Sequence, residues 1–505
     1  METHHNLNIS IPIVGHFDIG LEAKEIERLK IVSKNIIETE PALTTTEFFG
    51  ELTASGLGTG PKLMIGDHRE IALARPNKQS IYEYRLSLLA SHQDLVIIGG
   101  ERDYAFEQYV RKYLKLGAVD YLTPKSINLE EMCPLPLRCQ LDHLVLQKII
   151  STAITHGQLT IFPDLGTGSA WVLAATIAQK SNVQIFVASP PPRLTRRANN
   201  KLWFADVVKM VLGPQSRPPI YSAYGPTALT SRIHALSKKF ERVVAKVPDS
   251  AGSAGNLNFW SANIRKMSLS DLRLDVLKTL SDLGWKGSFP LLVQVWDCAV
   301  LSNASVQIWV PNSIVGPPIL EGIFEQSIEG VSGEFVGTNP TELPENLKFR
   351  IAEEALKIST VLQSCGYFGR CSFDAVVSGK NWQQSEVHWI ECNGRWGGVS
   401  IPMTLLNRIN DDWAESPFLV GRCRTSCFNP SQFKDIVTEL EDCLFDSSRY
   451  GEGLIVLSPI DSNHDYNLHF MTIGKTIVRA KEIAQAIIIK IHDLNNLVNE
   501  EVNQS

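Results

Sequence analysis

The sequence lacks the features of a membrane-spanning, secreted or nucleic-acid-binding protein. No apolar run approaches the roughly 20 residues that a transmembrane helix needs. The first residues show no basic region followed by an apolar stretch, so we expect no signal peptide. The 48 basic and 54 acidic residues give a formal net charge of -6. That balance predicts neither a nucleic-acid footprint nor a polybasic membrane patch. We therefore expect a soluble, cytoplasmic protein.

Cysteine is scarce and irregularly spaced. The nine cysteines include no Cys-x-x-Cys pair, and an odd number with this spacing argues against a disulfide framework or a structural zinc site. With 44% hydrophobic and 20% charged residues, the composition is that of a globular protein, which excludes bulk disorder. A length of 505 residues predicts about two to four domains.

The first third alternates short apolar runs with helical patterns, which predicts a parallel α/β sheet. We expect strands at 62–66, 94–100, 158–162 and 183–187 and helices at 80–90, 104–116 and 168–180. Three prolines within 189–193 predict a linker or surface turn, so we place a domain boundary between there and Asn200. The nearby Arg193, Arg196 and Arg197 are interpreted as a solvated basic turn.

The pattern changes after Asn200 to strands and helices of mixed order. We expect helices at 201–211, 228–240 and 347–363, strands at 242–247, 291–296, 305–310, 373–377 and 387–391, and two strands and a helix between 453 and about 489. We divide the chain into domains 1–199, 200–420 and 421–505.

A loop of small residues follows the strand that ends near Lys246. Such a loop lets backbone N–H groups approach phosphate oxygens closely, and the lysine would add a positive charge. By itself the pattern is more typical of a flexible turn. The loop residues of interest are Ser250, Gly252, Ser253, Gly255 and Asn256.

Three oxygen-bearing side chains lie on two neighbouring predicted strands. Asp374 is on one strand, Glu391 ends the next, and Asn393 is two residues further on, so it faces the same side as Glu391. Two carboxylates and an amide suit Mg²⁺, with Mn²⁺ as an alternative. Arg395 continues this face and could bind a phosphate. Asp374 or Glu391 alone would be interpreted as a solvated acid at a strand end. Polar groups that cluster directly after apolar strand residues are less expected by chance, so the combined pattern indicates a functional site.

The run Phe373-Asp374 followed by Ile390-Glu391-Cys392-Asn393-Gly394-Arg395 resembles the metal-binding end of ATP-grasp enzymes. Three further motifs agree with that family in order and spacing. Lys201 resembles its first ATP lysine, and Lys246 with the loop after it resembles its second lysine and glycine-rich loop. The family's adenine-binding hinge would fall on Gln294, Val295, Trp296 and Asp297.

The whole chain resembles the pheganomycin-type peptide ligases of this superfamily. The resemblance implies an α/β and α+β fold: an N-terminal parallel-sheet pre-ATP-grasp domain, a two-subdomain ATP-grasp fold and a small C-terminal α+β segment. It also implies an ATP-dependent carboxylate–amine ligase that forms an amide through an acyl phosphate. Its cofactors would be ATP and Mg²⁺, and its partners small-molecule or peptide substrates. A homodimer is the oligomer that we would expect first.

The resemblance also implies roles for single residues. Lys201 and Lys246 would hold ATP phosphates, and Asp374, Glu391 and Asn393 would hold the metal. Many members carry an arginine where this chain has Ser372, so the catalytic arginine would be Arg395 or Arg370. Gln294 stands where an acid is common, and Asp297 is the candidate ribose partner.

Two other functions stay open at this stage. An ATP-grasp kinase would transfer phosphate to a hydroxyl, and an inactive nucleotide-binding or scaffold protein would do no chemistry. Three features are interpreted as structural: Asp164–Gly168 as a turn with helix capping, His388 as a strand residue and Cys392 as core.

Overall fold

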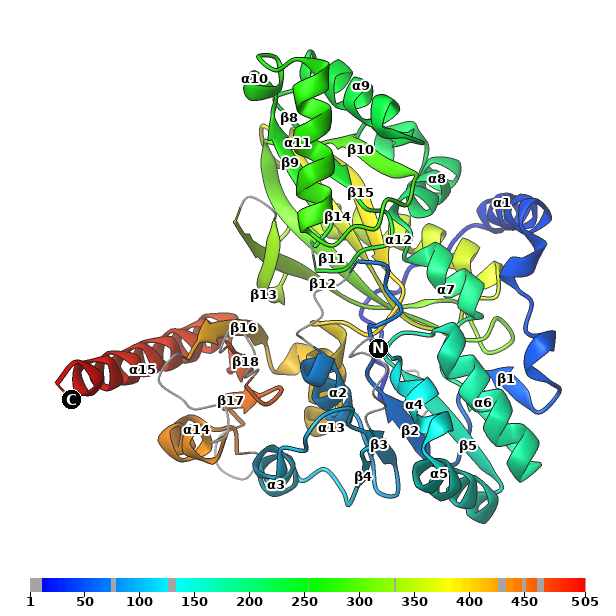
Figure 1. The fold of residues 1–505 in the computed structure, drawn as a ribbon, viewed down its shortest axis with the longest axis vertical. Helices are drawn as coiled ribbons and strands as arrows, with labels where there is room; N and C mark the ends of the chain where they lie inside the picture. The colour runs from blue at the N-terminus through cyan, green and yellow to red at the C-terminus, as the bar shows by residue number, and fades with distance from the viewer. Residues whose placement is uncertain are drawn as a thin grey trace.

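The computed structural model describes residues 11–73, 79–125, 133–252, 254–330, 333–425, 433–446, 451–460 and 467–504. Three sheets organise these residues, with six, four and eight strands. Figure 1 shows the N-terminal sheet and the C-terminal segment side by side below the central part of the chain. No helix among the described residues is long and apolar enough to span a membrane.

The N-terminal sheet is wholly parallel, in the order β1-β6-β5-β2-β3-β4. Its strands are β1 (Thr53–Ser55), β2 (Lys62–Ile65), β3 (Leu95–Ile97), β4 (Asp120–Leu122), β5 (Gln158–Pro163) and β6 (Gln184–Val187). The helices here are α2 (Gln79–Ser87), α3 (Tyr104–Tyr113), α4 (Leu135–Leu141), α5 (His143–His156) and α6 (Gly168–Ser181). The four predicted strands are confirmed. The short β1 and β4 were not predicted, because three residues carry too little pattern.

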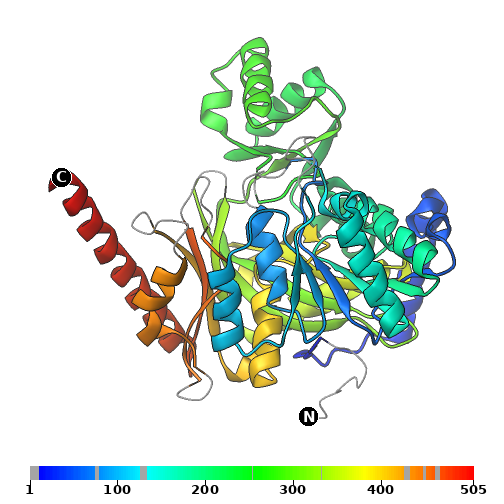
Figure 2. The same cartoon turned by 60° about the horizontal axis from the view of Figure 1, so that its bottom comes forward.

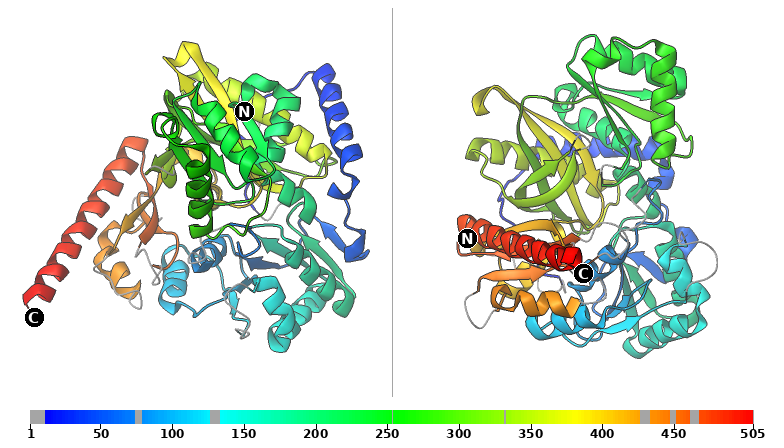
Figure 3. Two further views of the ribbon diagram at one scale, coloured as in Figure 1. Left: turned by 45° about the horizontal axis from the view of Figure 1, so that its top comes forward. Right: turned by 60° about the vertical axis from the view of Figure 1, so that its left-hand side comes forward.

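The four-stranded sheet is antiparallel, in the order β7-β10-β8-β9. It consists of β7 (Ile220–Ala223), β8 (Arg242–Lys246), β9 (Asn256–Trp260) and β10 (Leu291–Val295), with α9 (Pro226–Ser237), α10 (Ser261–Ile264) and α11 (Leu269–Asp282). Figures 2 and 3 show these elements as a lobe that stands off from the rest of the chain.

The eight-stranded sheet is antiparallel, in the order β15-β14-β11-β12-β13-β16-β18-β17. Its first five strands are β11 (Val300–Val310), β12 (Ile319–Glu329), β13 (Glu334–Pro340), β14 (Gly369–Gly379) and β15 (Ser385–Asn393). Helices α8 (Lys201–Leu212) and α12 (Glu345–Ser364) pack on these strands, and α1 (Ala23–Thr39) and α7 (Pro192–Ala198) pack against those helices.

The C-terminal segment continues this large sheet. It adds β16 (Phe418–Arg424), β17 (Gly453–Val456) and β18 (Asn467–Ile473), with α13 (Ser400–Asn410), α14 (Phe433–Glu439) and α15 (Ile477–Gln504). The predicted pair of strands followed by a helix is confirmed, and α15 packs along β16 and β18 (Figure 2). The fold class expected from the sequence is confirmed in all three parts.

Packing crosses the boundaries that the sequence suggested. Leu29 and Ile36 of α1 are buried in one core with Ile351 of α12. Phe106 of α3 packs edge-on against Phe433 of α14, with ring centroids 5.2 Å apart. The division into 1–199, 200–420 and 421–505 therefore stays a prediction, and α1 contributes to the core of the central part.

The prediction of a linker or turn over 189–193 is wrong from Pro192 onwards, where helix α7 begins. Pro192 stands at the first position of α7, where a proline loses no hydrogen bond and its fixed φ favours a helix. The arginines that follow are therefore presented on a helix, not on a turn.

Candidate functional site

The candidate metal ligands meet where β14 and β15 run side by side. Asp374 lies directly opposite Glu391 in the register of the two strands, next to a β-bulge. Asn393 donates from Nδ2 to Asp374 Oδ2 at 2.9 Å. The other oxygen of Asp374 accepts from Ser305 Oγ at 2.7 Å and from Gln326 Nε2 at 3.1 Å. Both oxygens of Asp374 are thus held in place by neighbouring strands.

The two carboxylates differ in electrostatic environment. Burial and the nearby Glu391 raise the pKa of Asp374 to about 6. Burial also opposes ionisation of Glu391, but the positive charges of Lys201 and Lys246 outweigh it and hold the pKa of Glu391 below its usual value. Glu391 is therefore the firmly ionised member of the pair near neutral pH.

Lys201 is fixed at the start of α8. Asn200 caps that helix by accepting from the N–H groups of its second and third residues. Lys201 is buried, and its Nζ lies 2.9 Å from Glu391 Oε2. The same Nζ donates to the carbonyl of Ser250 at 2.9 Å. One ammonium group therefore joins the candidate metal site to the small-residue loop.

Lys246 ends β8 and is buried close to the same charges. Burial lowers the pKa of Lys246 to about 8, although Glu391 and Asp297 favour its charged form. Its Nζ lies 5.8 Å from the centre of the Trp296 ring. The predicted second lysine thus interacts electrostatically with Glu391, a candidate metal ligand, and with two residues of the predicted hinge.

The hinge segment lies at the end of β10. Gln294 is buried, and the N–H groups of Val295 and Trp296 donate to the carbonyls of Pro219 and Arg242. Asp297 Oδ2 lies 3.0 Å from Nδ1 of His388. The structure brings the hinge beside Lys246, and the histidine interpreted as structural contacts the candidate ribose partner.

The small-residue loop after β8 forms backbone contacts with the N-terminal part of the chain. Ser250 forms a parallel β-bridge with Leu73, and the N–H of Ala251 donates to the Leu73 carbonyl at 3.1 Å. Gly252 has a φ of +62°, which favours glycine, and open space around it. Gly255 and Asn256 lead into β9, where Gly255 packs against Val247 and Asn256 pairs with Lys246. Ser253 lies outside the described residues.

The two candidate catalytic arginines occupy different environments. Arg370 is buried in an ion pair with Glu321 and donates to Thr404 Oγ1 at 3.1 Å. Its guanidinium also lies 4.7 Å from the centre of the Trp396 ring. Burial lowers the pKa of Arg370 to about 9. Arg395 lines the cavity instead and acts electrostatically on both candidate metal carboxylates.

Asn199 braces the turn between Asn393 and Arg395. Its Oδ1 accepts from the N–H of Gly394 at 3.0 Å, and its Nδ2 donates to the Gly394 carbonyl at 3.3 Å. A Cβ at Gly394 would lie 2.9 Å from Asn199 Nδ2. The sequence analysis did not single out Asn199, because its partner is 195 positions away.

These groups open onto a cavity of about 840 Å³, within the usual size range of small-molecule sites. Of the residues expected from the sequence, five line it: Lys201, Ser250, Glu391, Asn393 and Arg395. Cys392 also lines the cavity while its side chain is buried in the core. Asp374 does not line the cavity but accepts a hydrogen bond from Asn393, which does. Lys246 does not line it either, and it interacts with Glu391 by charge.

A second wall of the cavity, formed by residues of α7 and of the loops after β2 and β5, was not predicted from the sequence. Arg193, Arg196 and Arg197 of α7 all line the cavity, and two of them bind Glu40 at the end of α1. Their side chains are solvent-exposed as expected, but they stand on helix α7 and not on a turn. Asp164–Gly168 does cap α6 as expected, through Thr167, but Leu165, Gly166, Thr167 and Gly168 line the cavity as well.

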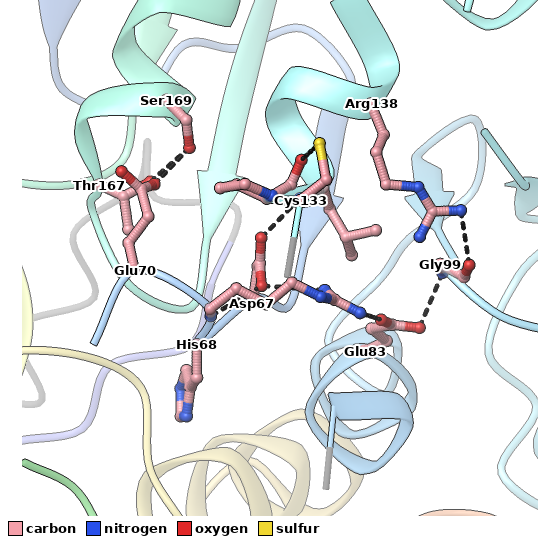
Figure 4. A network of polar contacts seen from close by, with 12 residues as sticks. Asp67, His68, Glu70, Glu83, Gly99, Cys133, Arg138, Thr167 and Ser169 are labelled. Atoms are coloured by element: carbon pink, nitrogen blue, oxygen red, sulfur yellow. Dashed lines mark hydrogen bonds and ion pairs between the residues drawn. The ribbon is translucent and has the colours of Figure 1, made fainter. Parts of the chain in front are cut away.

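Glu70 completes this wall from the loop after β2. Ser169 Oγ donates to its carboxylate (Figure 4). Behind it, Asp67 accepts from the N–H of Leu135 at 2.6 Å, and Glu83 accepts from the N–H of Gly99 at 2.8 Å. Figure 4 shows Asp67, Glu83 and Gly99 in this network, whose contacts join the segments after β2 and β3 to α4 and α2. The wall lies at the carboxyl ends of β2 and β5, where ligands bind in open parallel sheets.

Comparison with known proteins identifies the fold. The sequence matches no family model and no curated protein. Among solved structures, the ADP complex of PurK, N5-carboxyaminoimidazole ribonucleotide synthetase, is similar with a TM-score of 0.52 at 11% identity, covering 87% of this chain and 98% of its own. The chain has the ATP-grasp fold. The corresponding enzyme from Thermus thermophilus gives a TM-score of 0.51 at 12% identity, covering 86% of this chain and 98% of its own. The ADP complex of the Staphylococcus aureus enzyme gives 0.50 at 10% identity, covering 88% and 100%.

The donor set of this ATP-grasp fold suits an ion that is shared with phosphates. Among the described residues, no group of three or more His, Cys, Asp and Glu side chains is arranged to hold a metal. Asp374, Glu391 and Asn393 offer only two carboxylates and an amide. Mg²⁺ accepts such a small protein set, because it keeps water and phosphate oxygens as its other ligands.

Proposed function

We propose that this chain is an ATP-dependent carboxylate–amine ligase. The observation that carries the proposal is the joint geometry of Lys201, Glu391 and Ser250 within the ATP-grasp fold. One lysine bridges the oxygen ligands and the phosphate loop, so the triphosphate, the metal and the reacting carboxylate would meet at one point. In finer detail, we propose that the amide is a peptide bond, as in the pheganomycin-type ligases that the sequence resembles.

The nucleotide would lie between the small lobe and the large sheet. Gln294, Val295, Trp296 and Asp297 would hold adenosine. Lys201, Lys246, Ser250, Gly252, Ser253, Gly255 and Asn256 would hold the phosphates. Asp374, Glu391 and Asn393 would hold Mg²⁺ or Mn²⁺, which supplies positive charge to the phosphates and so lets an anionic carboxylate approach them.

The chain's own residues would then serve two successive steps. In the first, a substrate carboxylate oxygen attacks the γ-phosphorus of ATP and ADP leaves, which yields an acyl phosphate. In the second, an amine attacks the acyl carbon and inorganic phosphate leaves. Arg395 faces the cavity beside the candidate ligands, so we propose that it stabilises charge in both steps. Arg370 is already paired with Glu321 and is left out of this chemistry.

The experiment is an assay of ADP and free phosphate release with ATP and Mg²⁺ across pooled amino acids and short peptides. Mass spectrometry of the same reactions identifies the product. A product lighter than its two substrates by one water, formed together with free phosphate, is the expected result. A phosphorylated product without free phosphate would indicate a kinase, and nucleotide binding without turnover would indicate an inactive protein.

A further inference from the structure

The second wall of the cavity carries three arginines on one short helix. Arg193 and Arg197 are four positions apart on α7, and Arg196 is three from Arg193, so all three side chains lie on neighbouring faces. All three line the cavity together with Glu391 and Asn393. Their cationic groups therefore share one chamber with the proposed site of chemistry.

Glu40 orients two of these arginines through their Nε atoms and leaves their Nη atoms uncontacted. Arg193 Nε lies 2.6 Å from Glu40 Oε1, and Arg197 Nε lies 2.8 Å from Glu40 Oε2. Burial disfavours the charge on Glu40, yet the two guanidinium groups hold the pKa of this carboxyl below its usual value. Among the described residues, neither pair of Nη groups has a hydrogen-bond partner. One carboxylate thus fixes two guanidinium groups and leaves their paired donors available.

Arg196 has the weakest contact with a carboxylate of the three arginines. Its Nε lies 3.9 Å from Asp249 Oδ2, beyond hydrogen-bond distance, and its side chain is 80% exposed. Three cations therefore share two carboxylates along this wall. Paired guanidinium N–H groups match the oxygen spacing of a carboxylate, which is the geometry in which arginine binds anions best.

An acidic group lines the same cavity. Glu70 receives a hydrogen bond from Ser169 Oγ at the start of α6. An ionised carboxylate only accepts hydrogen bonds, so its remaining positions suit an ammonium group. The cavity therefore has the three arginines of α7 and the carboxylate of Glu70 in addition to the residues proposed to bind nucleotide and metal.

We propose that the second substrate is a zwitterion, an amino acid or peptide with a free carboxylate, held at its carboxylate by Arg193, Arg196 and Arg197. Its amine lies toward Glu70 before it attacks. The proposal rests on the proposed ligase function, because it names the amine substrate of that reaction. It excludes plain amines and substrates whose carboxyl group is blocked.

The test compares free-acid and amidated acceptors in wild-type protein and in Arg196→Gln. The probes are a pool of amino acids and dipeptides and the same pool as C-terminal amides, with ATP and Mg²⁺. We expect the free acids to be ligated and the amides to be poor substrates. In Arg196→Gln, the KM of the acceptor should rise about tenfold or more, the scale of one charged hydrogen bond, while the KM of ATP changes less than twofold. Arg196→Lys should recover part of the loss.

Arg273→Gln is the matched control, because Arg273 is an exposed arginine on α11 of the small lobe and does not line the cavity. Equal use of acids and amides would overturn the proposal, and so would a rise in the KM of ATP alone, which would assign Arg196 to the nucleotide.

Saturation-transfer NMR on the ADP-bound protein separates this proposal from the ligase function. Free-acid binding that exceeds amide binding and is lost in Arg196→Gln would support the anion site even if no product forms. Equal binding of both pools would overturn it, whatever the enzyme catalyses.

Discussion

The Nζ of Lys201 lies 2.9 Å from Oε2 of Glu391, so a lysine of the proposed phosphate site and a carboxylate of the candidate metal site form one ion pair. The same lysine reaches the carbonyl of Ser250 in the small-residue loop. Charge on the phosphates would compete with Glu391 for this ammonium, and metal charge would compete with the ammonium for Glu391. Nucleotide and metal are therefore expected to bind cooperatively, each releasing the partner that the other needs.

Glu391→Gln should strongly reduce Mg²⁺-dependent turnover while the fold survives. The change removes the firmly ionised ligand and keeps its size, and we expect kcat to fall by about 10²-fold or more, the scale of losing one electrostatic stabiliser. Steady-state assays at several Mg²⁺ concentrations measure the effect. Glu345→Gln is the control, because Glu345 begins α12 away from the cavity with its side chain 88% exposed. Unchanged turnover in Glu391→Gln would remove the metal assignment.

Nucleotide affinity should fall as the pH rises through about 8. Burial lowers the pKa of Lys246 to about 8 in the free protein, and only its charged form attracts phosphates. Bound phosphates favour that form, so binding takes up a proton above this pH. The Kd of ADP should then rise by up to about tenfold per pH unit. Calorimetric titration with MgADP from pH 7 to 9 measures this.

Lys246→Met should bind ADP weakly and with little change over the same pH range, because the titrating group is gone. Lys209→Met, an exposed change on α8, should keep the wild-type profile. A wild-type Kd that is constant between pH 7 and 9 would show that Lys246 is not the group that contacts the phosphates.

Arg370 and Arg395 should differ in what their loss affects. Arg370→Met leaves Glu321 buried without its counter-charge, which should lower the free energy of unfolding by about 3–5 kcal/mol and visibly reduce the thermal midpoint. Arg395→Met should leave the midpoint unchanged and lower kcat about 10²-fold. Scanning calorimetry and turnover of the folded protein separate the two effects. The double variant Arg370→Met with Glu321→Leu should regain stability. A stable but inactive Arg370→Met protein would return Arg370 to the chemistry.

Asn199→Ala should slow turnover without weakening nucleotide binding. Asn199 fixes both polar groups of the Gly394 backbone and so positions the residues on either side, Asn393 and Arg395. A small displacement of these groups should cost about tenfold in kcat, whereas the Kd of ADP should stay within twofold. Asn35→Ala, at an exposed position of α1, is the control. A loss of nucleotide affinity equal to the loss of kcat would instead show a general loosening of the site.

The grouping of the candidate metal and phosphate residues was predictable because their sequence signals are local. Glu391 and Asn393 share a strand face by simple alternation, and apolar residues around Asp374 predict its strand. Lys246 followed by small residues is likewise a pattern within ten positions.

The second wall of the cavity was not predictable, because the residues that form it are brought together by contacts between distant parts of the sequence. Glu40 binds Arg193 and Arg197 across more than 150 positions, and the prolines before the arginines suggest a turn, although Pro192 starts a helix. The pairing of Arg370 with Glu321 was not predictable either, because the two residues are 49 positions apart on different strands.

Leu73 is buried in the core of the small lobe, although it belongs to the loop that leaves β2. Only two residues separate it from Glu70, and its backbone carries the β-bridge to Ser250. The part of the cavity wall that carries Glu70 and the small-residue loop after β8 are thus joined by two residues of backbone and one β-bridge. A displacement of the backbone at Ser250 is therefore expected to move Leu73 and, across two residues, Glu70.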